Sequence, residues 1–126
     1  MRRSILRAGA VTALWLLTGW PAAAHHGGDV EWGNKTVGPI TGTATKFSFQ
    51  FPHVYFEMDV AENGGVAPWT ITTRWTPTIL RDHGWTRDSI KPGDKVTVTY
   101  LPHVAKSHIG QMQTIEVNGQ PLALSF

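Results

Sequence analysis

The chain has 126 residues, with eleven basic side chains, nine acidic ones and no cysteine. The absence of cysteine excludes disulfides, thiolate metal sites and covalent haem attachment. Three of the basic residues lie in an N-terminal segment that we expect to be removed, so the remainder carries eight against nine acidic ones. That near-neutral remainder lacks the clustered positive charge that nucleic-acid binding requires.

Residues 1–24 have the pattern of a signal peptide. Three arginines lie within the first seven residues, an uncharged run extends from Ala8 to Trp20, and Ala22 and Ala24 supply the small side chains of a cleavage site. The apolar run is too short for a membrane span, which takes about 20 residues. We therefore expect cleavage after Ala24 and a periplasmic or secreted protein of 102 residues. The arginine pair is compatible with both the general and the twin-arginine export route.

Residues 25–35 are polar, rich in glycine and without periodicity, so we predict an N-terminal arm followed by one domain over residues 36–126. Two strands are expected at the start of this domain. Apolar side chains occupy odd positions from Phe47 to Phe51 and even positions from Val54 to Val60. Because an alternating strand cannot change phase without a turn or bulge, the two strands should join near residues 50–53.

Asn63-Gly64-Gly65 is typical of a hairpin turn, and a third strand should follow. Its expected inward face is formed by Trp69, Ile71, Thr73 and Trp75. Thr76 and Pro77 then have the residue types of a helix N-cap and first turn. The short helix that they begin should present Ile79 and Leu80 to the core and end at Gly84, with Trp85 packing back on it.

Two further strands complete the pattern after a tight turn at residues 91–94. Val96, Val98 and Tyr100 alternate in the first, and Ile115 and Val117 mark the second, which ends at Asn118-Gly119. The order of elements predicts a mainly β fold, a small five-stranded OB-like β-barrel with one short helix between strands 3 and 4. An SH3-like or other small barrel is the alternative. The expected core includes Trp69, Ile71, Val96 and Val98.

In OB-folds, ligands bind on the face of strands 2 and 3, beside the loops that join strands 1 to 2 and 4 to 5. The first of these loops carries His53, and the second carries His103 and His108. Three histidines are thus expected near the binding face. His83 falls at the end of the helix, where an imidazole interacts with the last carbonyls, and we interpret it as structural.

Histidine chemistry suggests a metal site. A chain that begins at His25 offers its α-amine and the ring Nδ1 to one ion, and His26 provides a different chelate from the second position. The candidate metal ligands are therefore His25, His26, His53, His103 and His108. Imidazole suits copper, zinc and nickel, and intrinsic affinity favours copper. The alternative is that these histidines are solvated residues of the terminus and loops.

A second functional interpretation needs no metal. Aromatic residues in an OB-like domain can form a platform for a peptide, a cell-wall saccharide or an envelope protein partner, although most of the tryptophans should belong to the core. The sequence shows no phosphate-binding loop and no catalytic triad, so an enzyme is the least favoured class. The favoured function is a small exported binding module for a transition metal.

Several short motifs together resemble an exported bacterial family of unknown function, DUF6152. They are His25-His26, Lys35-Thr36-Val37, Thr41-Gly42-Thr43, Pro52-His53-Val54, Trp69-x-Ile71, Gly84-Trp85-x-x-Asp88 and Lys91-Pro92-Gly93-Asp94-x-Val96. The resemblance implies a small periplasmic β domain without an assigned activity. Phe51 stands where the family usually has Asn, and the loop from Leu101 to Gly110 is richer in histidine. A site at His53 is therefore carried over by the resemblance, whereas one at His103 or His108 would be particular to this chain.

Overall fold

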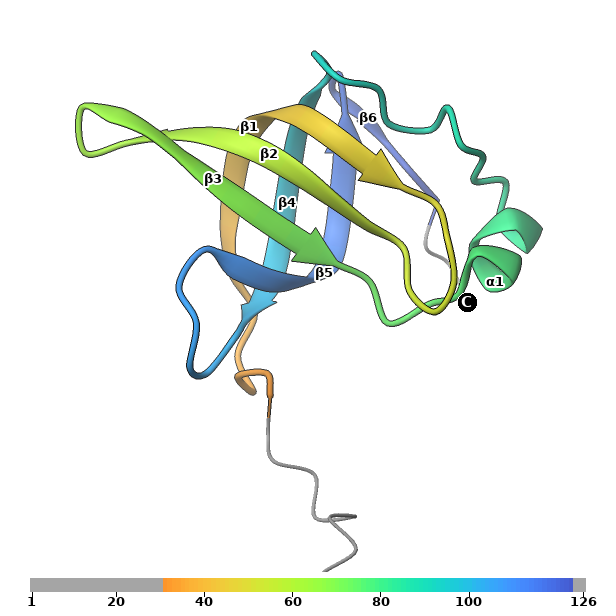
Figure 1. Cartoon of the computed structure of the whole chain (residues 1–126), viewed down its shortest axis with the longest axis horizontal. Coiled ribbons are helices and arrows are strands. Elements are labelled where there is room, and N and C mark those ends of the chain that lie inside the picture. Colours follow the sequence, from red (N-terminus) through yellow and green to blue (C-terminus); the bar gives the residue numbers. More distant parts are fainter. Residues whose placement is uncertain (1–30, 124–126) are drawn as a thin grey trace, which may run out of the picture.

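The computed structural model describes residues 31–123, and the predictions for residues 1–30, including those for His25 and His26, lie outside this range. The fold is mainly β, with one short helix between the third and fourth strands, as predicted (Figure 1). A two-residue sixth strand was not predicted. The elements are β1 (Val37–Ser48), β2 (Tyr55–Glu62), β3 (Gly65–Thr72), α1 (Pro77–Asp82), β4 (Lys95–Pro102), β5 (Ile109–Val117) and β6 (Gln120–Pro121).

The strands form a single sheet in the order β3-β2-β1-β4-β5-β6, in which all these neighbours are antiparallel. In addition, β3 and β5 pair in parallel through Thr70–Ile109, Ile71–Gly110 and Thr72–Gln111. Each of the strands from β1 to β5 therefore has a neighbour on both sides. Figure 1 shows these strands wrapping around a common interior, with the β2–β3 hairpin extending beyond it.

β1 is shared between β2 and β4, and an irregularity in its pairing changes which side chains face inward. The register with β2 shifts between Ala44 and Lys46. Before the shift the buried positions are Gly42 and Ala44, and after it the inward side chains are Phe47 and Phe49. A bulge inserts one residue and so reverses the alternation. This bulge explains why the phenylalanines occupy odd positions.

The core lies inside the wrapped sheet. The alternation predicted for the second and fourth strands is confirmed, because Val54, Phe56, Met58 and Val60 are buried, as are Val96, Val98 and Tyr100. Ile71 is also buried as expected. One prediction of burial was wrong, because Trp69 is only partly buried, packed against the core. Phe51 is 71% exposed, in the loop predicted to join the first two strands, because the chain has already left β1 at Ser48.

The helix confirms its predicted boundaries. Thr76 caps it by accepting the Ile79 N–H, and Pro77 is the first helical residue. After His83, Gly84 adopts a φ of 87°, and the N–H of Trp85 returns to the Leu80 carbonyl at 3.0 Å. Leu80 is fully buried, as predicted, but Ile79 is 41% exposed, so the prediction that Ile79 faces the core was wrong. In a helix this short, the buried stripe extends from Pro77 to Leu80 at a spacing of three.

The tight turn before β4 is held by the carboxylate of Asp94. Asn118 donates its Nδ2 to Asp94 Oδ1 at 3.0 Å, and the Lys91 N–H donates to Oδ2 at 2.8 Å. These two hydrogen bonds lower the pKa of the Asp94 carboxyl below its usual 3.8, and the bond from Asn118 has the larger effect. The same Asn118 accepts the Lys95 N–H, so the carboxylate joins the turn to the end of β5.

A pH dependence follows from this lowered pKa. A group whose folded pKa is depressed contributes stability above its unfolded pKa and loses that contribution as the pH falls through the folded pKa. We expect Asp94→Ala to lower the Tm at pH 7, and the difference from the parent protein to shrink below about pH 4. Scanning calorimetry at about pH 7 and about pH 2.5 measures both differences. An unchanged difference across this range would contradict the carboxylate's role.

Candidate functional site

The loop that joins β1 to β2, residues 49–54, is fixed at both of its ends and exposed in its middle. Phe49 and Val54 are buried in the core. The Val54 carbonyl accepts the Thr73 N–H at 2.9 Å, which ties this loop to the chain just beyond β3. Between these anchors, residues 50–53 face outward. His53 is therefore displayed from a firmly held backbone position next to a buried valine.

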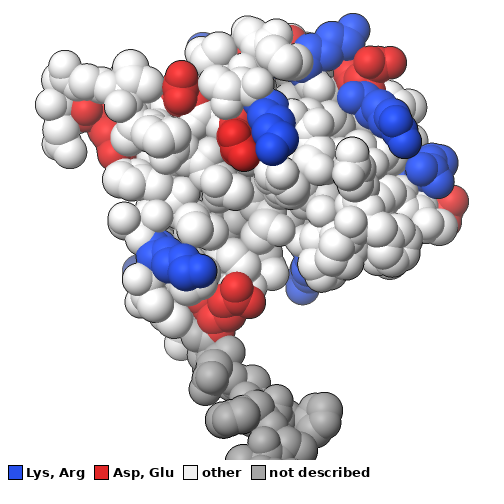
Figure 2. Space-filling model, in the orientation of Figure 1, with Lys and Arg blue, Asp and Glu red and all other residues white. Residues whose placement is uncertain are grey.

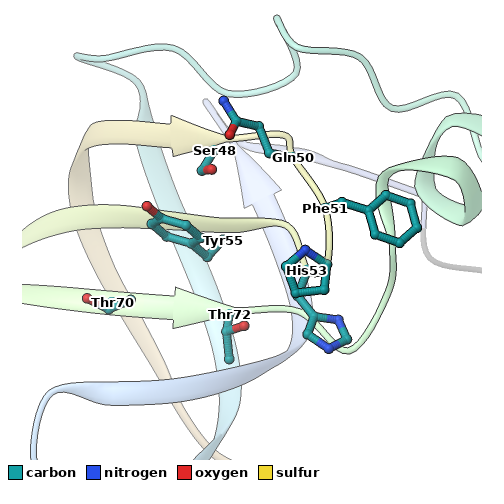
Figure 3. Close-up of a pocket in the computed structure, with 8 residues that line it drawn as sticks. Ser48, Gln50, Phe51, His53, Tyr55, Thr70 and Thr72 are labelled. Carbon is teal, nitrogen blue, oxygen red and sulfur yellow. The ribbon is translucent and has the colours of Figure 1, made fainter.

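A pocket of about 470 Å³, which we call the loop pocket, lies beside this loop on the outer face of β2 and β3. Figure 3 shows Phe51 and Tyr55 at opposite ends of it, with His53 between them and nearest to Thr72. Its lining combines rings with uncharged hydroxyl and amide groups, and the residues are Ser48, Gln50, Phe51, Pro52, His53, Tyr55, Thr70 and Thr72.

The charged groups nearest the loop pocket neutralise each other. Lys46 and Glu57, which pair across β1 and β2, lie with Nζ and Oε1 3.6 Å apart, and the Lys46 ammonium lies 5.3 Å from the centre of the Tyr55 ring. Hydrogen bonding to Lys46, and then to Ser48, lowers the pKa of the Tyr55 phenol. On the face shown in Figure 2, a basic and an acidic side chain lie side by side in the upper middle, with uncharged surface below them.

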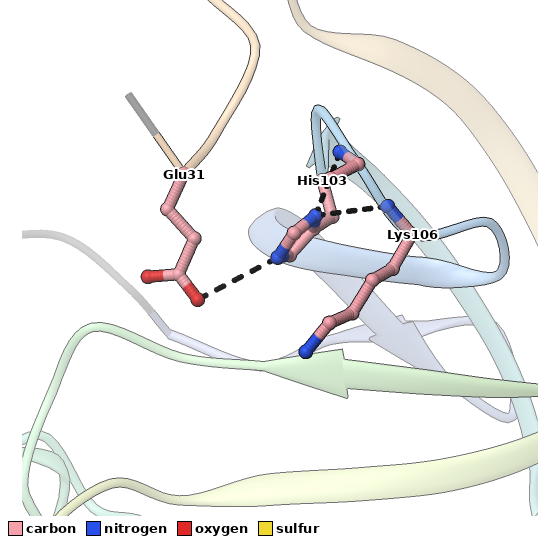
Figure 4. A network of polar contacts seen from close by, with 4 residues as sticks. Glu31, His103 and Lys106 are labelled. Carbon is pink, nitrogen blue, oxygen red and sulfur yellow. Dashed lines mark hydrogen bonds and ion pairs between the residues drawn. The ribbon is translucent and has the colours of Figure 1, made fainter. Parts of the chain in front are cut away.

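The loop that joins β4 to β5, residues 103–108, is organised around His103. Its Nδ1 accepts the backbone N–H groups of Ala105 and Lys106, both at 3.0 Å. Because Nδ1 accepts, the proton of the neutral ring is assigned to Nε2, which lies 3.7 Å from Oε1 of Glu31 (Figure 4). His103 thus has partners on both ring nitrogens.

Residues 31–33, in the predicted arm, contact the same loop. Trp32 forms an isolated bridge with His103, and the two rings meet edge to face with their centres 5.3 Å apart. Val104 donates its N–H to the Glu31 carbonyl at 3.0 Å, and Gly33 donates to the Pro102 carbonyl at 2.8 Å. These contacts hold residues 31–33 beside the 103–108 loop.

His108 is held at a different place. It adopts a φ of 58°, its Nε2 lies 2.5 Å from Oε1 of Glu62, and its ring centre lies 4.9 Å from that of Trp69. Glu62 ends β2, so this contact joins the 103–108 loop to the projecting hairpin. Burial, together with the charge of Glu62, raises the pKa of the nearby Tyr100.

A second pocket of about 350 Å³, the arm-side pocket, brings together two of the predicted site residues, His53 and His103. His108 does not line it. Glu31 and Trp32 form one side, and Arg74 and Lys106 add two positive charges. Within residues 31–123, neither of these two cations has an ion pair. His53 and Thr72 line both the arm-side and the loop pocket, so the two pockets adjoin.

The described residues alone do not provide a complete metal site. Within residues 31–123, no three His, Asp or Glu side chains gather closely enough to hold a metal ion. His53 is exposed and makes no hydrogen bond or ion pair with the rest of this region. It therefore differs from His103 and His108, each of which faces a carboxylate.

Most residues of the arm-side pocket were not identified from the sequence as metal ligands, among them the charged residues Glu31, Arg74 and Lys106 and the aromatic Trp32. Trp32 carried a usable signal, because a large aromatic residue in an otherwise polar, glycine-rich segment indicates a docking contact. Arg74 and Lys106 carried none, since they are single basic residues in segments that come together only through the pairing of β3 with β5.

Comparisons with known proteins complete this description. Within residues 31–123, no helix is long and apolar enough to cross a membrane. No curated protein matches the chain. Among solved structures, it is similar to the mitochondrial single-stranded DNA binding protein Rim1 of S. cerevisiae, at 12% identity and a TM-score of 0.48, with 68% of this chain and 95% of that chain covered. The sequence model described as a family of unknown function, DUF6152, matches residues 14–113. The resemblance found in the motifs is thereby confirmed, and the chain belongs to the DUF6152 family.

Proposed function

We propose that this protein is a small exported binding module, and that it binds copper or another transition metal through His53 and an N-terminal histidine. The module is a five-stranded OB-like barrel with β6 as an addition at its edge. Support for this arrangement is the pairing of β3 with β5, which gives each of the five long strands two neighbours. The two adjoining pockets lie on the β2–β3 face between the 49–54 and 103–108 loops, where OB-folds bind their ligands.

The observation that carries the metal proposal is the state of His53. Its imidazole is exposed, has no partner within residues 31–123, and extends from a backbone that Val54 anchors. A ligand on a rigid backbone loses little freedom when it coordinates. His103 and His108 already face Glu31 and Glu62, so the proposal leaves them outside the ligand set.

The remaining ligands come from the start of the exported chain. Cleavage after Ala24 makes His25 the first residue, with an α-amine and an imidazole that are close by covalent geometry. Glu31 lines the same pocket as His53. The six-residue step from Glu31 back to His25 spans at most about 20 Å, so the terminal chelate is within reach of His53. Two nitrogens from His25 and one from His53 suit Cu(II).

The test is a Cu(II) titration of untagged protein recovered after export, monitored by calorimetry and electron paramagnetic resonance. We expect one Cu(II) per chain with nitrogen ligation, and binding that weakens with acidity because amine and imidazole must lose protons to coordinate. Acetylation of the N-terminal amine should weaken binding by at least about tenfold, and so should His53→Ala, because losing even an outer-shell partner has that effect.

His83→Ala is the matched control, since it removes an imidazole at the end of α1 and should leave the Cu(II) affinity unchanged. Equal affinity before and after the terminus is blocked would refute the chelate. A mass measurement showing that the exported chain starts elsewhere than His25 would refute it as well. If only His53→Ala had no effect, the chelate would stand without the contribution of the domain.

A further inference from the structure

We propose that the loop pocket and the arm-side pocket form one cleft for a saccharide that carries a carboxylate. The two pockets share His53 and Thr72 and have volumes of about 470 and 350 Å³. Their linings differ in a systematic way. The first offers rings and uncharged polar groups. The second adds two cations without an ion pair, Lys106 and Arg74, whose guanidinium lies 5.0 Å from the centre of the Trp75 ring. A ligand that fits both has a neutral, hydroxyl-bearing body and one anionic substituent.

The loop pocket has the chemistry of sugar recognition. Phe51 exposes 71% of its surface, and Figure 3 shows Phe51 and Tyr55 at opposite ends of the pocket. The hydroxyls of Thr70 and Thr72 and the amide of Gln50 lie between or beside these rings. Few precisely placed polar groups among aromatic surfaces are typical of small-ligand sites, and neutral donors and acceptors match sugar hydroxyls.

An extended peptide fits this position less well. A peptide that adds to a sheet needs an open strand edge with free N–H and C=O groups. The loop pocket lies on the face of β2 and β3, and these strands pair with each other through Tyr55–Thr72 and Glu57–Thr70. Their facing backbone groups are therefore already used, and recognition must come from side chains.

The arm-side pocket supplies the anion site. Arg74 and Lys106 reach it from the end of β3 and from the 103–108 loop, and the one acidic residue of its lining, Glu31, faces Nε2 of His103. Figure 4 shows the Lys106 side chain extending away from its own loop. Two cations against one partnered carboxylate leave an excess of positive charge at this end of the cleft, and a guanidinium binds a carboxylate through paired hydrogen bonds.

A long polyanion is disfavoured by the neighbouring surface. Glu57 and Asp59 continue the outward row of β2 beyond Tyr55, and Asp59 is exposed. Lys46 compensates Glu57, but a nucleic-acid strand running along this face would meet the carboxylate of Asp59, which has no ion pair within residues 31–123. The positive charge is local to the arm-side pocket, so it selects a single carboxylate rather than a chain of phosphates.

The test uses two disaccharides that differ by one carboxylate-bearing group. The acidic probe is N-acetylglucosamine linked to N-acetylmuramic acid, and the neutral probe is chitobiose; digalacturonate is a second acidic probe. Titration is followed by amide chemical shifts in EDTA, so that the proposed metal site stays empty. We expect an acidic probe to bind at least about tenfold more tightly than chitobiose, because charge-assisted hydrogen bonds are stronger than neutral ones.

Variants separate the two halves of the cleft. Phe51→Ala should weaken the acidic and neutral probes alike, whereas Arg74→Gln should weaken only the acidic probe, again by about tenfold. Val66→Ala and Lys95→Gln are the matched controls, an exposed apolar residue and a lysine that line a different pocket. Two results would overturn the proposal: no acidic probe binding more tightly than chitobiose, or a single-stranded oligonucleotide binding more tightly than both acidic probes. Loss of Cu(II) binding in the other experiment has no bearing on this one.

Discussion

Trp85→Ala is expected to lower the free energy of unfolding by about 3–5 kcal/mol, the range for removing a large buried aromatic side chain. Trp85 is 1% exposed and packs where the end of α1 meets the sheet, with its ring centre 6.4 Å from that of Phe47. Its Nε1 also donates to the Ala123 carbonyl at 2.9 Å, which holds the segment after β6. The substitution therefore opens a cavity and removes the donor to the Ala123 carbonyl.

Two further variants distinguish these contributions in urea denaturation. Trp85→Phe keeps much of the packing but removes the hydrogen bond, so its effect should be smaller than that of alanine. Trp32→Ala removes a half-buried tryptophan that packs on the 103–108 loop, and it should change the unfolding free energy much less. If alanine at positions 32 and 85 destabilised the protein equally, Trp85 would not hold the core together as we describe.

Gly42→Ala is the second substitution with a large expected effect, at about 1–3 kcal/mol of destabilisation. A Cβ at this position would lie 2.6 Å from the Asp59 carbonyl oxygen, 3.0 Å from Val60 Cγ2 and 3.1 Å from Met58 Sδ. The first of these is a backbone atom of β2, so relief requires the strands to move apart. Gly42 is thus required for the close approach of β1 to β2.

Gly65→Ala is the matched control, because its added Cβ would be no nearer than 4.0 Å to the Glu62 carbonyl oxygen. It also removes glycine's flexibility from the unfolded chain, so any loss there should be slight. Thermal unfolding of both variants measures the difference. Comparable stability of the two would show that β2 yields at Gly42 without cost.

Local patterns were sufficient for most of the fold. The alternation from Val54 to Val60, the Asn63-Gly64 turn and the Thr76-Pro77 helix start each depend on neighbours in sequence, and each is confirmed. The errors arose where distant contacts decide. Trp69 shares the odd-numbered face of Ile71, but its ring meets those of Tyr100 and His108 edge to face and stays only partly buried.

The candidate site was predictable only in part for the same reason. The order of elements led us to expect His53, His103 and His108 near one ligand-binding face, and the first two line the arm-side pocket whereas His108 does not. Their different environments depend on Glu31 and on the turn at residues 103–106, which the order of elements does not specify. Arg74 and Lys106 come together because β3 pairs with β5, and these two strands are distant in the chain.

The parallel pairing of β3 with β5 is the shortest junction among the five long strands, extending only from Thr70–Ile109 to Thr72–Gln111. Where the ladder is short, local opening takes less free energy than global unfolding, and amide hydrogen exchange is fastest. The last pair of this junction, Thr72 and Gln111, lines the arm-side pocket. A bound ligand would contact both β3 and β5, so it would bind the form with these strands separated less well than the paired form. Ligand binding in the cleft and local opening of the β3–β5 pairing would therefore be thermodynamically linked, because each would reduce the population of the other.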